Sequence, residues 1–269
     1  MTPHLRKQLV VVGHGMVGHR FVQAAIERGL TETYDIVVLA DEPRAAYDRV
    51  ALTSFFEVGA QALSFLPAGH YDDPRVTLHL SAEVTMMDTA ARTVTTADGT
   101  TWRYDELVLA TGAAPFVPPV PGKDLAGVFV YRTIEDLERI REASQDARAG
   151  AVIGGGLLGL EAANALHQLG VETHVVEMAP RLMAVQVDDA GGATLQRHIT
   201  DLGLNVHTGV VTERINGDAE GRVAGITFQG EPTLALDIVI VSAGIRPRDA
   251  LARAAGLEVA ERVGVLVNE

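Results

Sequence analysis

The sequence contains no cysteine. Without a thiol, the chain can form no disulfide bond, no thiolate nucleophile, no zinc–thiolate site and no iron–sulfur cluster of its own. This composition fits a reducing compartment, and we expect a cytoplasmic location. The histidines have no metal-ligand spacing, so no metal site is predicted.

Basic residues are scarce, with 22 Lys and Arg against 35 Asp and Glu and a net charge of −13. Nucleic acids and anionic membrane surfaces bind clustered Lys and Arg, so neither is an expected partner. No apolar run approaches the roughly 20 residues of a membrane-spanning helix, and the N-terminal sequence MTPHLRKQLV is charged, unlike a signal peptide. At 269 residues and 47% hydrophobic content, a globular protein of one or two domains is predicted.

Glycines follow the first apolar run at a spacing that suits a dinucleotide. Residues 8–12 predict a buried parallel strand, and a helical pattern follows the glycines as far as Gly29. In such a turn the first glycine permits the tight bend, the second lets the backbone approach a pyrophosphate, and the third lets helix and strand pack closely. The helix N-terminus offers N–H groups and the positive end of its dipole to phosphates. The three glycines are Gly13, Gly15 and Gly18.

An acidic residue completes this first glycine motif. A second apolar strand, predicted at residues 36–39, is followed closely by Asp41 and Glu42. A carboxylate at this point accepts hydrogen bonds from the hydroxyls of an adenosine ribose. Both acids are candidates, and Asp41 is favoured because it comes first after the strand.

The same arrangement occurs a second time in the chain. A strand at 151–153, three glycines, a helix and another strand lead to an acid, Glu177. This acid favours NAD over NADP, because a carboxylate repels a 2′-phosphate. Arg181 could offset that repulsion, and we interpret it instead as a solvated surface residue. The glycines of this second motif are Gly154, Gly156 and Gly159.

The similarity of the two halves extends beyond the glycine motifs. Each half continues with turn-rich, alternating sequence that predicts an antiparallel ribbon, at 76–102 and at 206–234, and the halves close on YDELVLATGAAP and LDIVIVSAGIRP. A proline-rich stretch at 115–121 separates them and predicts a crossover between domains. We therefore predict an α/β fold with two Rossmann-like nucleotide-binding domains, each with a small antiparallel ribbon. Two such units suggest FAD together with a nicotinamide cofactor, with hydride passing between their rings.

Longer segments carry a family resemblance over essentially the whole chain. The segments GHGMVGHRF, YDRVALTSFF, LVLATGAAPFVPPVPG, VYRTIEDLERI, VIGGGLLGLEAANALHQLGVETHVVE and VSAGIRPRDALA together resemble the pyridine-nucleotide-dependent flavoprotein reductases. Within these, they look most like the N-terminal FAD/NAD region of the large subunit of assimilatory NADH nitrite reductases. The resemblance implies an FAD domain at 1–118, an NAD domain at 119–245 and a return to the FAD domain at 246–269.

The resemblance also implies site residues. In the FAD domain, Arg49 would lie near the flavin phosphates, Val84 would offer backbone contacts to the adenine, and Thr111 would help to close over the FAD. In the NAD domain, Glu161 would lie near the nicotinamide. The alternatives are that Arg49 is a surface charge and that Glu161 is a helix acid favoured by the dipole. The full implied FAD set is Gly13, Gly15, Met16, Gly18, Asp41, Arg49, Val84, Thr111 and Gly112. The implied NADH set is Gly154, Gly156, Gly159, Glu161, Glu177 and Gly244.

The implied function is the oxidation of NADH by FAD, with electrons passing to a downstream redox centre for nitrite reduction. No catalytic side chain is identified. The implied partners are iron–sulfur and siroheme modules or a redox protein, and a homo-oligomer is possible. The alternatives are a ferredoxin or rubredoxin reductase, or a dinucleotide-binding module without catalysis.

Two departures from the family bear on this expectation. Dithiol chemistry is excluded because the family's cysteine pair is missing, and Ser54 stands where some ferredoxin-reducing relatives have a lysine nearby. In the family, a further flavin-contacting segment and an interface domain follow the point at which GVLVNE ends this sequence. We therefore expect the 269-residue chain to be a fragment or a short form that holds FAD weakly and self-associates.

Overall fold

The computed structural model describes residues 6–230, 232–260 and 264–268 and contains two compact units, each built on a parallel sheet. The first unit comprises residues 1–51, 58–114 and 246–269, and the second comprises 52–57 and 115–245. The chain leaves the first unit in strand β8 (Ala113–Pro115) and returns in strand β17 (Ile245–Pro247), and these strands pair with each other. The predicted α/β fold with two units, each built on a parallel sheet, is confirmed.

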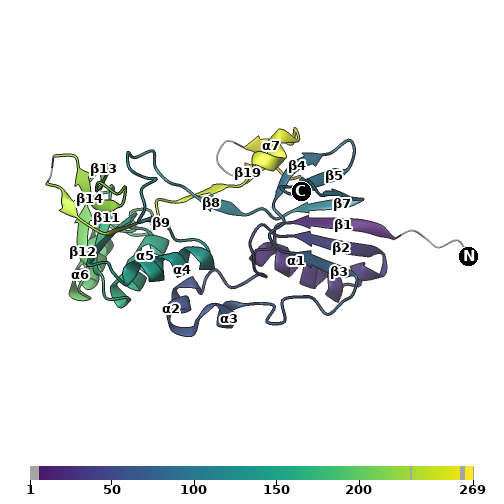
Figure 1. The fold of residues 1–269 in the computed structure, drawn as a ribbon, viewed down its shortest axis with the longest axis horizontal. Coiled ribbons are helices and arrows are strands. Elements are labelled where there is room, and N and C mark those ends of the chain that lie inside the picture. Colours follow the sequence, from purple (N-terminus) through teal and green to yellow (C-terminus); the bar gives the residue numbers. More distant parts are fainter. Residues whose placement is uncertain (1–5, 231, 261–263, 269) are drawn as a thin grey trace, which may run out of the picture. The chain divides into compact units, whose positions relative to one another are not determined.

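The first unit has a four-stranded parallel sheet in the order β3–β2–β1–β7. Helix α1 (Met16–Glu27) covers one face of this sheet (Figure 1). Helix α7 (Ala250–Ala254) and an antiparallel ribbon cover the other. The sheet strands are β1 (Lys7–Val12), β2 (Tyr34–Leu39), β3 (Val76–His79) and β7 (Glu106–Leu109). The ribbon strands are β4 (Val84–Asp88), β5 (Thr93–Thr96) and β6 (Thr101–Arg103).

The core of the first unit explains why β1 is an unbroken apolar run. Successive side chains of a strand point to opposite faces, so a strand that is covered on both faces must be apolar throughout. Leu9 and Val11 pack with Val22 of α1, whereas Val10 and Val12 pack toward the ribbon. All five side chains are buried.

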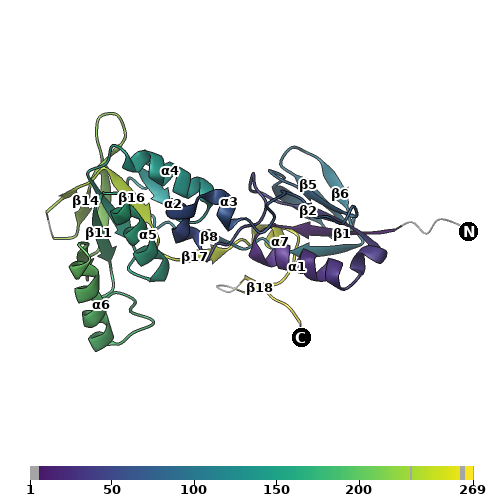
Figure 2. The same cartoon turned by 90° about the horizontal axis from the view of Figure 1, so that it is seen from below.

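The second unit has a five-stranded parallel sheet in the order β12–β11–β10–β16–β9. Helices α4 (Ile134–Ser144), α5 (Leu157–Gln168) and α6 (Asp189–Asp201) connect its strands, and α5 packs against β10 and β11 (Figure 2). The strands are β9 (Val128–Val130), β10 (Ala149–Ile153), β11 (Glu172–Glu177), β12 (Asn205–Thr208) and β16 (Ile238–Val241). An antiparallel ribbon contains β13 (Thr212–Gly217), β14 (Val223–Phe228) and β15 (Leu234–Ala235).

The two units repeat one topology. The strand order β3–β2–β1–β7 corresponds to β12–β11–β10–β16, with an antiparallel ribbon before the last strand in each case. The predicted ribbons were wrong at their first residues. Val76 and Val206 lie in β3 and β12, which pair in parallel with β2 and β11. These short strands contain alternating polar residues because they form one edge of each sheet, and alternation alone cannot separate an edge strand from a ribbon.

Residues 52–57 belong to the second unit, although the sequence predicts them in the first domain. Thr53 donates a hydrogen bond to Glu161 of α5 at 3.3 Å, and the guanidinium of Arg141 lies 5.1 Å from the centre of the buried Phe55 ring. The change from first to second unit at 114–115 also falls slightly before the expected boundary at 118. Such contacts join distant segments and leave no periodic signal in the sequence.

The remaining elements are short. They are η1 (Leu30–Glu32), η2 (Leu52–Ser54), α2 (Phe55–Val58), α3 (Ala60–Leu63), β18 (Val259–Ala260) and β19 (Gly264–Val265). In the part of the chain that the structure describes, no helix has the length and apolar composition needed to cross a bilayer.

Candidate functional site: two dinucleotide sites

The first glycine motif connects β1 to α1 and needs its glycines for three different reasons. Gly13 has φ +101°, and a Cβ there would collide with the carbonyl of Ala110. A Cβ on Gly18 would collide with the carbonyl oxygen of Gly13. Gly15 is different, because its φ is −80° and the nearest described atom to a Cβ would be Arg49 Nε at 3.9 Å. Gly13 and Gly18 are therefore required for folding, whereas Gly15 leaves space open.

The second glycine motif connects β10 to α5 with the same geometry. Gly154 has φ +121°, and a Cβ there would collide with the carbonyl of Ser242. A Cβ on Gly159 would collide with the carbonyl oxygen of Gly154. At Gly156, a Cβ would have no described atom within 4 Å. In each unit the second glycine thus keeps a space free above the helix N-terminus. A pyrophosphate fits such a space, because only a backbone without a side chain lets it approach the N–H groups.

The helix N-termini differ in how their N–H groups are satisfied. Thr133 caps α4 in a capping box with Asp136, and the Asp188 side chain accepts a hydrogen bond from the Gly191 N–H of α6 at 2.8 Å. Among the described residues, no side chain caps α1 or α5, whose N-cap residues are Gly15 and Gly156. The first N–H groups of a helix lack intrahelical partners. These two helices therefore present free donors and a positive dipole end, as an anion site requires.

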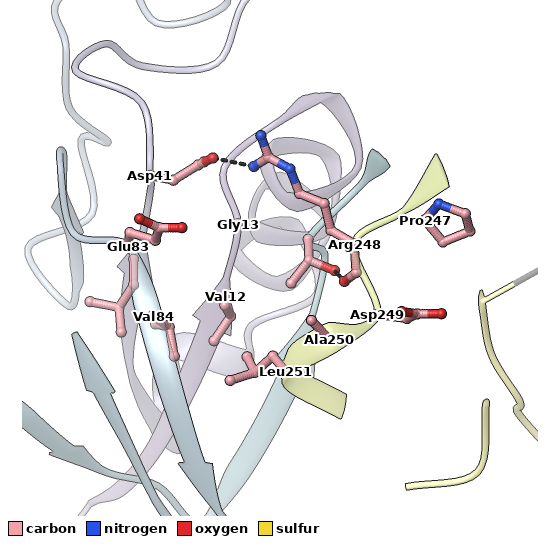
Figure 3. Close-up of a pocket in the computed structure, with 12 residues that line it drawn as sticks. Val12, Gly13, Asp41, Glu83, Val84, Pro247, Arg248, Asp249, Ala250 and Leu251 are labelled. Carbon is pink, nitrogen blue, oxygen red and sulfur yellow. Dashed lines mark hydrogen bonds and ion pairs between the residues drawn. The ribbon is translucent and has the colours of Figure 1, made fainter. Parts of the chain in front are cut away.

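A pocket of about 380 Å³ lies in the first unit beside the glycine motif (Figure 3). It brings together four of the predicted FAD contacts, namely Gly13, Asp41, Val84 and Thr111. Val12, Leu39, Glu83, Pro247, Arg248, Asp249, Ala250 and Leu251 complete its lining. Apolar walls from β1, β2 and α7 with a few polar groups suit an adenosine. Gly112 lies next to Thr111 and accepts a hydrogen bond from the Arg248 N–H at 3.0 Å.

Arg248 is a pocket residue that was not predicted from the sequence. Its guanidinium forms an ion pair with Asp41, and Figure 3 shows the two side chains pointing toward each other. The Thr111 hydroxyl donates to the Arg248 carbonyl at 2.8 Å, which fixes the backbone of Arg248 at the pocket. Arg248 and Asp41 are 207 residues apart in the chain, so no local pattern could have associated them. The available signal was the segment GIRPRD, which forms part of the family resemblance.

The two candidate acids after β2 have different partners. Asp41 lines the pocket, whereas Glu42 accepts a hydrogen bond from the Tyr47 hydroxyl at 2.7 Å and pairs with Arg49. Arg49 also packs over the ring of Tyr47, 4.9 Å from its centre. Burial opposes the charge of Arg49, but the neighbouring groups, including Glu42, raise its pKa overall. Arg49 thus stays charged beside Gly15, and Met16 follows as the first residue of α1.

The second unit contains a larger pocket of about 760 Å³, lined mainly by apolar residues. It brings together Gly154, Gly156, Gly159, Glu177 and Gly244, all predicted for NADH. Its other lining residues include Phe116, Tyr131, Arg132, Leu157, Met178, Val210, Val211, Thr212 and Ile245.

The remaining predicted NADH contact, Glu161, is not among the residues that line this pocket. It lies on α5, where it accepts a hydrogen bond from Thr53. The pocket residue Tyr131 was not predicted. Burial raises the pKa of its phenol to about 12, so it stays protonated at neutral pH.

Glu177 is held in place by the backbone of its own unit. Its carboxylate oxygens accept the N–H of Gly155 at 2.6 Å and the N–H of Ala179 at 2.7 Å. These bonds orient the carboxylate at the pocket and tie it to the glycine motif. Arg181 is not the solvated residue expected from the sequence. It donates to the carbonyl of Val187 at 3.0 Å and to Asp189 at 2.7 Å, which holds it in its own loop.

The family model for pyridine nucleotide-disulphide oxidoreductases matches residues 7–269. The chain is 51% identical over 261 residues to a nitrite reductase [NAD(P)H] large subunit of Klebsiella oxytoca, covering 97% of this chain and 27% of that protein. It is 42% identical over 263 residues to the nitrite reductase (NADH) large subunit of Escherichia coli, covering 97% of this chain and 31% of that protein. The chain thus spans about a third or less of the length of these curated relatives.

Solved structures share the fold. The chain aligns to a ferredoxin reductase of Rhodopseudomonas palustris with a TM-score of 0.85 and 30% identity, covering 95% of this chain and 63% of that one. A NAD-dependent persulfide reductase of A. fulgidus aligns with a TM-score of 0.85 and 28% identity, covering 94% of this chain and 49% of that one.

Together, the glycine motifs, the two pockets and the family match define an oxidoreductase built on two dinucleotide-binding units. The chain belongs to the pyridine nucleotide-disulphide oxidoreductase family, and the predicted dependence on FAD and NADH is confirmed by this membership.

Proposed function

We propose that this chain is the NADH-oxidising module of a flavoprotein nitrite reductase. The observation that carries the proposal is that each unit has one helix, α1 or α5, whose N-terminus has no side-chain cap and whose second motif glycine leaves space open. A chain with two such sites binds two dinucleotides, one in each unit. The identity to nitrite reductase large subunits supports the choice of electron acceptor.

The first unit is proposed to hold FAD. The pyrophosphate would lie over Gly15 and Met16 at the N-terminus of α1, with the charged Arg49 beside it. The adenosine would enter the pocket between Val84 and Asp41, whose carboxylate would accept hydrogen bonds from the ribose. Thr111 and Gly112 hold the returning chain at this pocket through Arg248 and would close over the cofactor.

The second unit is proposed to hold NADH. Gly156 leaves room for the pyrophosphate at the N-terminus of α5, and Glu177 would accept the hydroxyls of the adenosine ribose. Gly244 lines the same pocket, and Glu161 on α5 is proposed for the nicotinamide end. With Arg181 bound to its own loop, a 2′-phosphate would meet the carboxylate of Glu177 without that cation. The site therefore favours NADH over NADPH.

When bound, FAD supplies the hydride-accepting chemistry and releases electrons to a further redox centre. The residues of this chain bind and orient the two cofactors, so positioning is the main contribution that the protein makes. No described side chain is proposed as a general acid or base. The phenol of Tyr131 and the imidazoles of His14 and His19 are neutral at neutral pH, because burial disfavours their charged forms.

A redox partner follows from this chemistry. We propose that iron–sulfur and siroheme modules receive the electrons, since the large subunits that match this chain are named as nitrite reductases and are three to four times its length. A cytoplasmic location and a homo-oligomer remain predictions. The second candidate is a ferredoxin reductase. It is supported by 34% identity over 97% of this chain to a probable ferredoxin reductase of Castellaniella defragrans, 64% of whose length is covered.

The proposal is tested by reconstituting the chain with FAD and adding NADH in the absence of oxygen. Loss of the flavin's visible absorbance is the expected result, and binding of both nucleotides without reduction would indicate a non-catalytic module. The reduced protein is then mixed either with the iron–sulfur and siroheme part of a nitrite reductase or with a ferredoxin. Electron transfer to the ferredoxin alone would support the second candidate and contradict the nitrite assignment.

A further inference from the structure

A hydrogen-bonded cluster of three buried polar side chains lies directly under the first glycine motif. His14 stands within the motif, His19 lies on the first turns of α1, and Tyr71 comes from the loop before β3. The Tyr71 hydroxyl is 2.9 Å from Nε2 of His14 and 2.9 Å from Nδ1 of His19. All three side chains are buried, with exposed fractions of 5%, 4% and 8%.

The hydrogen bonds define which atoms carry the protons. The Ala46 N–H donates to Nδ1 of His14 at 3.1 Å, so that nitrogen has no proton. A neutral His14 therefore carries its proton on Nε2 and donates it to the Tyr71 oxygen. The Tyr71 hydroxyl is then the donor to Nδ1 of His19. Burial supports the neutral forms, because it lowers the pKa of both histidines and raises that of Tyr71.

The cluster joins the two backbone segments that face the proposed pyrophosphate. On one side, His14 belongs to the glycine motif itself. On the other side, the Ala46 N–H bonded to His14 belongs to the segment that continues to Arg49, whose Nε lies 3.9 Å from where a Cβ of Gly15 would be. The His14 ring thus connects the glycine motif to the segment that carries Arg49. Tyr71 in turn fixes the orientation of that ring.

We propose that Tyr71 is a positioning residue for the FAD pyrophosphate, acting through His14 and His19 to align the first glycine motif with Arg49. This inference rests on the proposed function of the first unit. Tyr71 does not touch the cofactor, and its contribution is the geometry of the groups that do. Packing alone does not require the hydroxyl, because the Tyr71 ring contacts both imidazole rings through its own faces and edges.

The test is Tyr71→Phe, which keeps the ring and removes the hydroxyl. It leaves His14 Nε2–H and His19 Nδ1 without their shared partner, and we expect the dissociation constant for FAD to rise about tenfold. NADH binding to the second unit should not change. Tyr34→Phe is the matched control, because Tyr34 begins β2 at the end of the sheet opposite to the glycine motif. FAD titration by flavin fluorescence and NADH titration measure both constants.

Two further variants separate positioning from packing. His19→Asn places an amide oxygen near the position of Nδ1 and should retain FAD affinity, whereas His19→Leu removes the acceptor and should lower it as Tyr71→Phe does. In an Arg49→Ala background, Tyr71→Phe should raise the dissociation constant for FAD by a smaller factor than it does in the unmodified chain. The reason is that part of its effect comes from the position of Arg49, which this background lacks. If Tyr71 only packs, the losses of FAD affinity in Tyr71→Phe and Arg49→Ala should be additive, and His19→Asn should bind FAD as weakly as His19→Leu.

The outcomes distinguish this inference from the proposed function. If the unmodified chain binds no FAD, the proposed function fails. If the unmodified chain binds FAD and Tyr71→Phe binds it equally well, the positioning role is wrong while the FAD site stands. A lower melting temperature of Tyr71→Phe with an unchanged FAD dissociation constant would also overturn it. If Tyr71→Phe does not fold, the comparison of His19→Asn with His19→Leu still decides the question.

Discussion

Replacing Gly15 by alanine should separate folding from cofactor binding in the first unit. Its φ of −80° is accessible to every L-residue, and a methyl group there would have Arg49 Nε, at 3.9 Å, as its nearest described neighbour. A glycine-to-alanine change at a compatible backbone conformation stabilises a protein by about 0.4–1 kcal/mol, because the unfolded chain loses freedom. Gly15 is also the N-cap residue of α1, a position where alanine is less favourable than glycine. The two effects are of similar size and opposite sign, so Gly15→Ala should fold with about the stability of the unmodified chain.

The same methyl group should nevertheless weaken FAD binding. It would occupy the space above the N-terminus of α1, where the pyrophosphate must approach uncapped N–H groups. Loss of one hydrogen bond to a charged group costs about 1.5–3 kcal/mol, which corresponds to about a ten- to hundredfold rise in the dissociation constant. The expected phenotype is thus a melting temperature close to that of the unmodified chain combined with weak flavin binding.

The assay combines thermal unfolding of the flavin-free chain with FAD and NADH titrations. Gly156→Ala is the matched control in the second unit, where it should weaken NADH and spare FAD. Gly18→Ala is the contrasting control, since its methyl group would collide with the carbonyl of Gly13 and should destabilise the fold itself. Unchanged FAD affinity in Gly15→Ala would refute the assignment of this motif to the pyrophosphate. Loss of NADH binding in place of FAD would show that the two sites are exchanged.

Three further predictions follow from the described contacts. NADH should be preferred over NADPH by at least about tenfold, or ~1.4 kcal/mol, and Glu177→Ala should narrow that ratio in steady-state kinetics; equal kcat/KM for both cofactors in the unmodified chain would contradict it. Burial lowers the pKa of His14 to about 4, below its unfolded value near 6.5. As the pH falls, the His14 side chain is therefore protonated in the unfolded chain before it is protonated in the folded chain. The free energy of unfolding should fall by about 3 kcal/mol between pH 6.5 and pH 4, as measured by denaturant unfolding. His14→Asn should flatten this dependence. Arg248→Ala should raise the FAD dissociation constant severalfold, because it removes a half-exposed ion pair worth about 1 kcal/mol or less. An unchanged constant would show that the Arg248 side chain does not contribute to FAD binding.

The local sequence alone determined the repeated units and the centre of each site. Strand, glycine turn, helix and acid are consecutive in the chain, so hydrophobic periodicity and glycine spacing predict them directly. Gly13 and Gly18 are needed because backbone atoms approach too closely for any side chain. The family resemblance then supplied Arg49, Val84 and Gly244, which carry no local signal of their own. Val84 and Gly244 line the two pockets, and Arg49 lies beside Gly15.

Only the tertiary structure decided which distant groups share these sites. The pairing of Arg248 with Asp41, the packing of residues 52–57 with the second unit, and the bridge from Tyr71 to His14 and His19 all connect segments far apart in the sequence. From the sequence, His14 and His19 could be judged only by their lack of metal-ligand spacing, which is a local property, whereas the Tyr71 hydroxyl that they share comes from a distant segment. Parallel strands bring their carboxyl ends to one edge of a sheet, and side chains from unrelated loops meet there. That convergence is created by folding, and no periodicity in the chain records it.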